Sequence, residues 1–389
     1  MIETDEHQLF RKTLRDLFER EIQPHVDEWE AARTFPAHDL FPKLGAVGLL
    51  GLEYDEAYGG MGADHTYSMI AGEEMGRISC GGVPMAMAVQ MSMSTPALAR
   101  YGSHELKEQY LAPAIRGEAV TSIAVTEPDA GSDVAGIRTR AVRDGDEWVI
   151  NGQKMFTTFA HRADYCFLLT RSDPASRGPR GLTMFLVPMG TSGIEIQAVR
   201  TMGYERTNIV FYNDVRVSDD LRVGEPEQGL HVMRAALEAE QNVAPSSRTS
   251  QLYEAAVVWA RETPAPDGDT TMLDNPSVRR RLARMAIDAE VADLLGTRVG
   301  FLEQLGAKPG PHAALFGPET YVHWSKEIMD MVGPAAMADW TDPDAVVGGT
   351  FEYHFRCSVA STIYGGSSEV LRSLIAEQLL GLPRSRPKT

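Results

Sequence analysis

The stretch Thr121–Asp133, which reads TSIAVTEPDAGSD, marks the point where the hydrophobic period of the chain changes. Upstream of it, apolar residues recur at helical spacing, as in the run from residue 7 to 32. Downstream of it come short runs rich in β-branched and aromatic residues, separated by Gly, Asp, Asn and Pro. Within the stretch, a predicted strand ends at Thr126, and Gly131 and Ser132 allow a tight turn.

The β-rich segment extends to about residue 225, and its Asp144-Gly145 pair is typical of a hairpin turn. After Gly229 the helical period returns, with a predicted interruption near Pro245. The order is therefore helices, strands, helices, without βαβ alternation. This order predicts an α+β fold with a helical domain over 1–119, a compact β domain over 120–225 and a helical domain over 226–389.

Composition and charge exclude several function classes. The formal net charge of −17 repels phosphate backbones and anionic lipid, so we expect neither nucleic-acid binding nor membrane insertion. No G-x-G-x-x-G follows a predicted strand, which disfavours a Rossmann nicotinamide enzyme. The N-terminus lacks the pattern of a secretory signal, and Cys80, Cys166 and Cys357 lie far apart. The cysteine spacing argues against a disulfide framework or a metal site and favours a cytoplasmic protein.

Three segments are candidates for chemistry. The turn at Gly131–Ser132 leaves backbone N–H groups for an acceptor, although a plain strand-to-loop turn explains it equally well. Asn151–Thr158, which reads NGQKMFTT, predicts a hairpin turn at Asn151-Gly152 that places an aromatic ring and two hydroxyls on the next strand. An ordinary half-buried strand is the alternative there. In Ile363–Arg372, which reads IYGGSSEVLR, two glycines interrupt a helical pattern and indicate a close backbone approach.

Four segments together resemble the acyl-CoA dehydrogenase family in order and spacing: AVTEPDAGSD, INGQKMFTT, DVRVSDDLRVGEPEQGL and IYGGSSEVLRSLIAEQLLG. The resemblance covers essentially the whole chain. It implies an N-terminal helical domain, a central β-barrel or sandwich domain and a C-terminal four-helix bundle. It also implies an FAD flavoprotein that dehydrogenates an acyl-CoA thioester between its α and β carbons.

The resemblance assigns flavin contacts residue by residue. Phe156 replaces the more usual Trp beside the flavin ring, and Thr158 matches the hydroxyl that donates to flavin N5. In the C-terminal motif, Ser367 and Glu369 fall at cofactor-binding positions. The residues that match those holding the flavin and its substrate in the strand-to-loop segment are Val125, Thr126, Gly131 and Ser132.

The family's reaction requires a carboxylate that takes the α-proton while the thioester carbonyl is hydrogen-bonded. Many members place this carboxylate directly after the Tyr of the C-terminal motif, where this chain has Gly365. Other members place it on the first bundle helix, and alignment from the preceding motif puts Glu240 there. The resemblance therefore implies Glu240 as the base and Gly365 as a backbone N–H donor. Without it, Glu240 reads as a solvated helix residue, as does Glu238.

Two family features that hold FAD across a subunit interface are missing. Trp259–Asp267 lacks the expected Phe-Gly, and Asp330–Ala336 replaces a glycine-rich loop. There, Pro334 removes a backbone donor and Ala335 adds a Cβ. We hypothesise that a homologous chain supplies this half of the site in an α2β2 heterotetramer. The chain is similar here to bacterial members that shorten steroid side chains, and a homotetramer is the alternative.

The resemblance implies electron-transferring flavoprotein as the acceptor of electrons. Three other functions stay open: a flavin acyl oxidase, a dehydrogenase of acyl-carrier-protein substrates, and a non-catalytic partner subunit of a heteromeric dehydrogenase. The Met-rich stretch Pro84–Met93 lines either the acyl pocket or a packed core.

Overall fold

The computed structural model of the chain describes residues 3–176, 178, 180–203, 206–242, 246–266, 268–307 and 310–383, without the side chains of 240–242, 246, 247, 303 and 304. The chain divides into two compact units, a sheet unit and a bundle unit. The sheet unit holds Asp5–Ser68 and Ile78–Glu240, and the bundle unit holds Met1–Thr4, Met69–Arg77 and Gln241–Thr389. The three domain boundaries expected from sequence stay a prediction.

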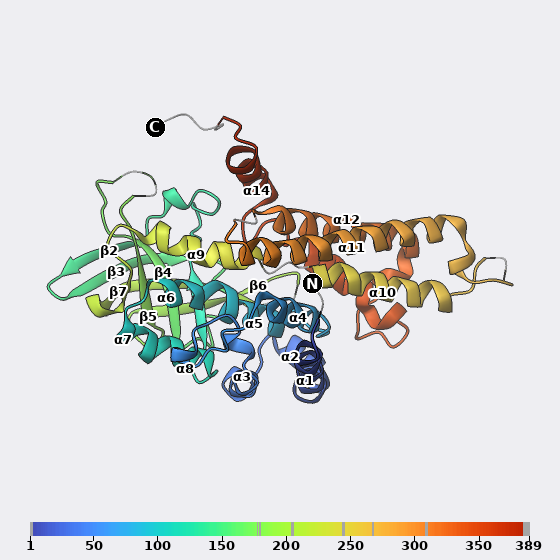
Figure 1. Cartoon of the computed structure of the whole chain (residues 1–389), viewed down its shortest axis with the longest axis horizontal. Helices are drawn as coiled ribbons and strands as arrows, with labels where there is room; N and C mark the ends of the chain where they lie inside the picture. Colours follow the sequence, from blue (N-terminus) through green and yellow to red (C-terminus); the bar gives the residue numbers. More distant parts are fainter. Residues whose placement is uncertain are drawn as a thin grey trace. The chain divides into compact units, whose positions relative to one another are not determined.

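The sheet unit is built on an eight-stranded sheet in the order β6-β7-β3-β2-β4-β5-β8, with β1 paired to β4 (Figure 1). Neighbouring strands of the sheet run antiparallel, except that β4 is parallel to β1 and to β2. The strands are β1 Thr121–Ala124, β2 Arg140–Asp144, β3 Glu147–Lys154, β4 Tyr165–Arg171, β5 Leu182–Pro188, β6 Ile194–Arg200, β7 Arg206–Ser218 and β8 Arg222–Val223. The predicted Asp144-Gly145 hairpin joins β2 to β3, since Asp144 pairs with Glu147.

Helices of the sheet unit precede the sheet in the chain, and one follows it. Two π-helical segments, Val89–Ser94 and Lys107–Leu111, join α5 to α6 and α7 to α8. Helix α4, His65–Gly76, begins in the sheet unit and ends in the bundle unit. The other helices are α1 Asp5–Glu21, α2 Val26–Ala32, α3 Ala37–Ala46, α5 Gly82–Ala88, α6 Thr95–Tyr101, α7 His104–Leu106, α8 Ala112–Ile115 and α9 Gly229–Asn242.

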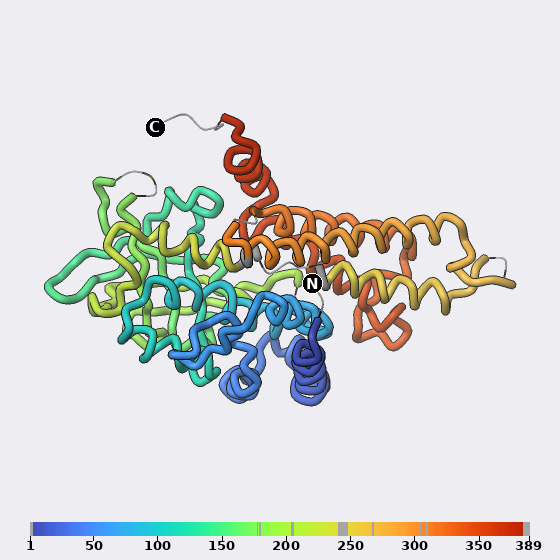
Figure 2. The backbone as a smooth tube through the Cα atoms, viewed as in Figure 1, coloured from blue at the N-terminus to red at the C-terminus, as the bar shows by residue number. Residues whose placement is uncertain are grey.

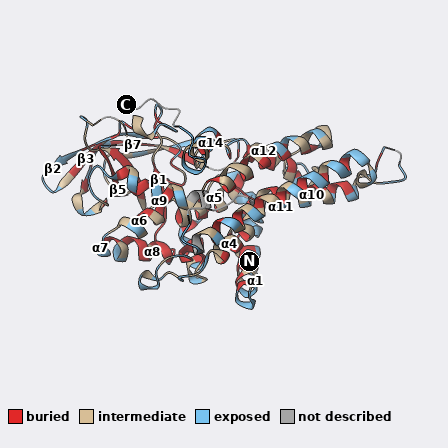
Figure 3. Cartoon of the chain, turned by 45° about the horizontal axis from the view of Figure 1, so that its top comes forward, coloured by how far each residue is buried: buried red, intermediate tan, exposed pale blue. Residues whose placement is uncertain are grey.

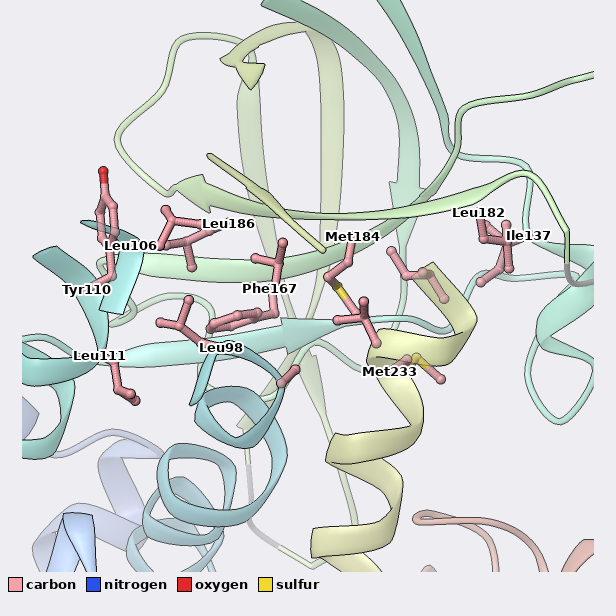
Figure 4. Packing of buried hydrophobic residues seen from close by; sticks show 14 of the residues in the cluster. Leu98, Leu106, Tyr110, Leu111, Ile137, Phe167, Leu182, Met184, Leu186 and Met233 are labelled. Carbon is pink, nitrogen blue, oxygen red and sulfur yellow. The ribbon is translucent and has the colours of Figure 1, made fainter. Parts of the chain in front are cut away.

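Strands β4 and β5 are buried on both faces, which explains their nearly continuous apolar sequence. Because side chains alternate along a strand, Phe167 joins one apolar cluster and Leu168 the other. Figure 4 shows Phe167 beside Leu98 of α6, with Met233 of α9 in the same cluster. Each such side chain contributes about 1.5–3 kcal/mol when fully buried. Helices α6 and α9 are therefore held on one face of the sheet.

The Met-rich stretch contributes to the core around β1. Met87 is fully buried, and so is Gln90. The Gln90 amide donates to the carbonyls of Ala114 and Ala119 and accepts from the Thr121 backbone N–H. A buried amide with all of these partners fixes where β1 begins. For Met87 and Gln90, core packing is the correct interpretation.

The expected hairpin turn at Asn151-Gly152 is wrong. Both residues lie inside β3, at a bulge opposite β7 where the register shifts between Ile150 and Gly152. Gly152 has a φ of 151°, and a Cβ there would lie 2.7 Å from the Thr139 Cα. The glycine is therefore required for close approach of two backbones and not for a turn. Phe156 and Thr158 lie in the loop after β3, and not on a following strand.

The bundle unit confirms the expected C-terminal four-helix arrangement. Helices α10, α11 and α12 run side by side (Figures 1 and 2), and the shorter α13 contacts α10 and α12. Its helices are α10 Ser246–Glu262, α11 Pro276–Gln304, α12 His312–Val332, α13 Thr350–Ser358 and α14 Ser368–Leu374. Buried residues follow one side of α10 and α11 (Figure 3), and Trp259, Met285 and Tyr321 belong to the shared core. The predicted interruption near Pro245 falls outside the described residues, between α9 and α10. Among the described helices, none combines the length and the apolar character that crossing a membrane requires.

Candidate functional site

The structure brings two of the predicted segments together at the ends of β1 and β3. The Met155 N–H donates to the Thr126 carbonyl at 2.7 Å. This bond places Val125 and Thr126 beside the loop that carries Phe156 and Thr158. Segments that are distant in the sequence thus form one group on the sheet unit.

The turn after β1 lies earlier than expected. The Glu127 N–H donates to the Ala130 carbonyl at 2.9 Å, and the Ala130 N–H returns a bond to Glu127 at 3.2 Å. Gly131 and Ser132 follow this turn and are exposed. Their backbone N–H groups meet no acceptor in the described part of the chain. A Cβ on Gly131 would touch nothing within 4 Å, so the chain's own packing does not require a glycine there.

The loop after β3 is strained and presents an aromatic ring. Phe156 has a φ of 55° and a side chain that is 55% exposed. Phe159 has a φ of 64°, but its ring is buried against Phe35 at 4.9 Å between centroids. A positive φ at a bulky residue costs about 1–3 kcal/mol and persists only where neighbouring structure enforces it. The enforcing contacts here are those of Phe159 and the bonds between Thr157 and Asn208.

The Thr158 hydroxyl is half-buried and weakly bonded within the chain. Its oxygen lies 3.5 Å from both the Phe156 carbonyl and the Thr207 hydroxyl. Both distances exceed those of ordinary O–H···O hydrogen bonds. The hydroxyl is therefore available to donate to an acceptor placed beside Phe156.

Two charged residues of these segments were not assigned any role from the sequence. Lys154 ends β3 and is fully buried, where it forms an ion pair with Glu127 at 2.9 Å. The sequence signal that could have identified Lys154 is a charged residue at a strand position that faces the apolar core. Its partner is 27 positions away and could not be identified from local pattern.

In the bundle unit, the C-terminal motif forms a loop and a helix start. Gly365 and Gly366 have φ values of 67° and 105°, a backbone conformation that favours glycine. Ser367 is the N-cap of α14, and its hydroxyl accepts from the Val370 N–H. Glu369 is exposed, and hydrogen bonds from its own backbone N–H and from the Ser367 side chain lower its pKa. Ser367 thus has a capping role, and a cofactor role for Ser367 and Glu369 stays a prediction.

Glu240 belongs to α9, but its side chain lies outside the described residues. By helical spacing, position 240 falls on the same face of α9 as the buried residues Met233 and Ala236. Glu238 falls on a different face, is 57% exposed and pairs with Arg100 at 3.3 Å. The helix therefore separates the two acidic residues of the EAEQ sequence.

The two segments that depart from the family pattern are packed or tightly turned. Trp259 is buried in the bundle core, and Asp267 lies outside the described residues. After α12, Gly333–Met337 forms a 3-10 helix with Pro334 in its first turn and Ala336 buried. An open glycine-rich loop is absent from this part of the described chain.

A buried histidine makes the bundle unit sensitive to acid. The Tyr321 hydroxyl and His354 Nδ1 lie 2.9 Å apart, and His354 is 5% exposed. Burial, with a smaller effect of Arg248, lowers the pKa of His354 to about 3. The native side chain thus stays neutral at pH values where an unfolded histidine is protonated.

We expect acid to destabilise the native protein through His354. Between the unfolded pKa of about 6.5 and the native value of about 3, only the unfolded state binds the proton, so stability falls as pH falls. The loss between pH 7 and pH 5 is about 2 kcal/mol. His354→Gln should remove this part of the pH dependence in urea unfolding, whereas Tyr321→Phe, which keeps the imidazole, should retain it. An unchanged pH dependence in His354→Gln would show that the histidine titrates normally.

Comparison with known proteins identifies the family. Three family models match in order: the acyl-CoA dehydrogenase N-terminal domain at residues 4–118, the middle domain at 122–215 and the C-terminal domain at 227–380. The chain belongs to the acyl-CoA dehydrogenase family. Acyl-CoA dehydrogenase FadE26 of Mycobacterium tuberculosis is 33% identical, over 89% of this chain and 88% of that protein.

Solved structures of the family agree with the fold. The ChsE4-ChsE5 complex from Mycobacterium tuberculosis contains a chain that is 30% identical, with a TM-score of 0.89, covering 99% of this chain and 100% of that one. The Tcur3481-Tcur3483 steroid ACAD contains a chain that is also 30% identical, with a TM-score of 0.86 and 99% coverage of both. The resemblance seen in the four motifs and the expected fold are confirmed.

Members of the acyl-CoA dehydrogenase family are flavoproteins, so FAD is the implied cofactor. The sheet unit fits such a group. It offers an exposed aromatic ring at Phe156, a hydroxyl at Thr158 with only long contacts, and two exposed backbone N–H groups at Gly131 and Ser132. A flat ring system with several hydrogen-bond acceptors and attached phosphates matches these donors.

Proposed function

We propose that this acyl-CoA dehydrogenase is an FAD-dependent enzyme that introduces a double bond between the α and β carbons of an acyl-CoA thioester. The observation that carries the proposal is the bond between Met155 and Thr126, which brings the two flavin-type segments into one group. FAD, when bound, accepts the hydride from the β-carbon. The remaining tasks fall to side chains and backbone groups of this protein.

Glu240 is proposed to take the α-proton. A thioester α-C–H is a weak acid, so the base must be a positioned carboxylate and the carbonyl oxygen must receive hydrogen bonds. Gly365 is proposed to donate one of these bonds through its backbone N–H. The left-handed backbone at Gly365 supports this role, because a residue without Cβ leaves room for the thioester.

The cofactor contacts follow the same proposal. Phe156 would pack against the flavin ring, and the Thr158 hydroxyl would donate to the central nitrogen of that ring. In the C-terminal motif, Ser367, which also caps α14, and Glu369 would add polar contacts to the cofactor. The residues proposed to bind the cofactor and the adjoining part of the substrate in the strand-to-loop segment are Val125, Thr126, Gly131 and Ser132.

We propose that a homologous chain completes the FAD site in an α2β2 heterotetramer. The support lies in this chain's own departures, since Pro334 and the 3-10 helix after α12 replace the loop that would accept the cofactor across an interface. The similar ChsE4-ChsE5 and Tcur3481-Tcur3483 structures are complexes of two named chains. The steroid naming of the second supports a role in lipid or steroid catabolism, and the cytoplasm is the proposed location. Electron-transferring flavoprotein is the proposed acceptor.

The proposed function predicts reduction of bound flavin by acyl-CoA. Under anaerobic conditions, the purified holoprotein should lose its visible flavin absorbance on adding a saturated CoA thioester, with formation of the α,β-unsaturated product. A panel from short branched to polycyclic acyl groups, offered as CoA and as carrier-protein thioesters, identifies the substrate. Stable bound FAD that no thioester reduces would contradict the proposal, and rapid reoxidation by O₂ would identify an oxidase.

A further inference from the structure

A buried ion pair joins the two segments that carry the proposed flavin contacts. The Lys154 ammonium lies 2.9 Å from the Glu127 carboxylate, and the two side chains are 0% and 7% exposed. The same ammonium donates to the Val125 carbonyl at 2.8 Å. Lys154 lies just before the loop of Phe156 and Thr158, and Glu127 directly follows Thr126.

The carboxylate also binds a third segment. The backbone N–H groups of Arg138 and Thr139 donate to the two Glu127 oxygens at 2.7 and 2.9 Å. With Lys154, Glu127 therefore receives three hydrogen bonds. A fully satisfied buried network of this kind is rigid, and it holds β1, β3 and the start of β2 in one register.

The charges of the pair persist in the folded protein. Burial opposes ionisation of Glu127, but Lys154 and the bonds from Thr139 and Arg138 hold the pKa of that carboxyl below its usual value. Burial lowers the pKa of Lys154 to about 8, against the influence of Glu127, so the ammonium predominates at neutral pH.

Stability does not by itself explain why the pair is buried. Well-packed apolar residues often stabilise a core as well as a buried ion pair or better, and in some proteins such a pair instead specifies one arrangement. The arrangement specified here is the placement of the Val125 and Thr126 carbonyls. Lys154 binds the first, and the N–H of the residue after Lys154 binds the second.

We propose that Lys154 and Glu127 are positioning residues for FAD, whose ion pair sets the distance between Val125–Thr126 and the Phe156–Thr158 loop. This inference rests on the proposed function. Neither residue needs to touch the cofactor. They act through the backbone of the segments that do.

The test is the double variant Lys154→Met with Glu127→Gln. The introduced amide keeps an acceptor oxygen for only one of the Arg138 and Thr139 N–H groups, because these two groups donate to different Glu127 oxygens. The introduced thioether fills most of the lysine's space, but the Val125 carbonyl loses its donor. From diluted holoprotein, measured with the partner chain where the complex requires one, we expect an FAD dissociation constant roughly 10–100-fold above wild type. The visible absorption bands of the flavin that stays bound should shift, because the ring lies differently beside Thr158.

A matched control uses another pair of the same sheet. Arg222 of β8 and Asp219 lie 3.0 Å apart and are 19% and 25% exposed. Arg222→Met with Asp219→Asn should lower the unfolding temperature without changing FAD release or the flavin spectrum. Glu127→Gln alone, which retains the lysine, should fold and release FAD about three- to tenfold more readily.

Three outcomes are decisive. Wild-type FAD release and spectrum in the double variant would overturn the inference, as would equal FAD loss in the Arg222/Asp219 control. If the double variant does not fold, wild-type release by Glu127→Gln would overturn it. If wild-type protein binds FAD but thioesters never reduce that FAD, the result contradicts the proposed function and does not affect the positioning test.

Discussion

Replacing Glu240 by Gln should lower the rate of flavin reduction by acyl-CoA roughly 10²–10⁴-fold, the range for loss of a general base. The amide keeps the size and polarity of the side chain but cannot accept the α-proton. FAD should remain bound, since the contacts proposed for it lie on other residues. The measurement is anaerobic stopped-flow reduction at saturating substrate, with bound FAD quantified in parallel.

Glu238→Gln is the matched control. It is two residues away on the same helix and removes the same charge, but Glu238 is exposed and pairs with Arg100. This variant should reduce its flavin at the wild-type rate. Wild-type reduction by Glu240→Gln would show that the proton goes elsewhere.

Adding Gly365→Glu to the Glu240→Gln variant provides a gain of function. It places a carboxylate at the position that many family members use, so part of the lost rate should return. The recovery is limited, because Gly365 has a φ of 67° and a side chain there costs roughly 1–2 kcal/mol. No recovery in a folded, FAD-loaded double variant would argue against a shared role for the two positions.

Much of the fold was predictable because it depends on local periodicity. The change at Thr121–Asp133 from helical to strand spacing places β1, and the Asp144-Gly145 pair makes the hairpin it predicts. Asn151-Gly152 is an equally strong local turn signal. It forms a bulge because pairing of β3 with β7 continues past it and the Thr139 backbone lies against Gly152. Those contacts are not visible in the local sequence.

The site was predictable to the extent that its residues stand in recognisable motifs. The motifs propose Phe156 and Thr158 as flavin contacts by position, but the strained φ of Phe156 could not be foreseen from them. The ion pair of Lys154 and Glu127 joins residues 27 positions apart through a register that only the folded sheet sets. Likewise, the presence of Ser367 has a local explanation, because this residue caps α14. The family motif alone assigns it to cofactor binding.

The chain expressed alone should bind well below one FAD per polypeptide, and co-expression with a homologous chain that retains the missing loop should restore full loading. The reason lies after α12, where Pro334 offers no N–H and Ala336 is buried in the bundle core. That segment is poorly suited to receive a cofactor from a second copy. Released FAD is measured by its fluorescence after denaturation, alongside the mass of the complex in solution.

A loop variant separates this explanation from general instability. Pro334→Gly together with Ala335→Gly restores a donor and removes a Cβ, so it should raise the FAD content of the chain expressed alone. Ala338→Gly, just beyond the 3-10 helix, changes backbone freedom without altering the loop and should have no effect. A homogeneous, fully loaded and active homotetramer of the unmodified chain would contradict the heteromeric proposal, because it would show that other residues hold the adenosine half of FAD. If the chain alone binds little FAD and only the partner chain raises its FAD content, then residues of the partner chain perform the cofactor-binding role that the segment after α12 lacks.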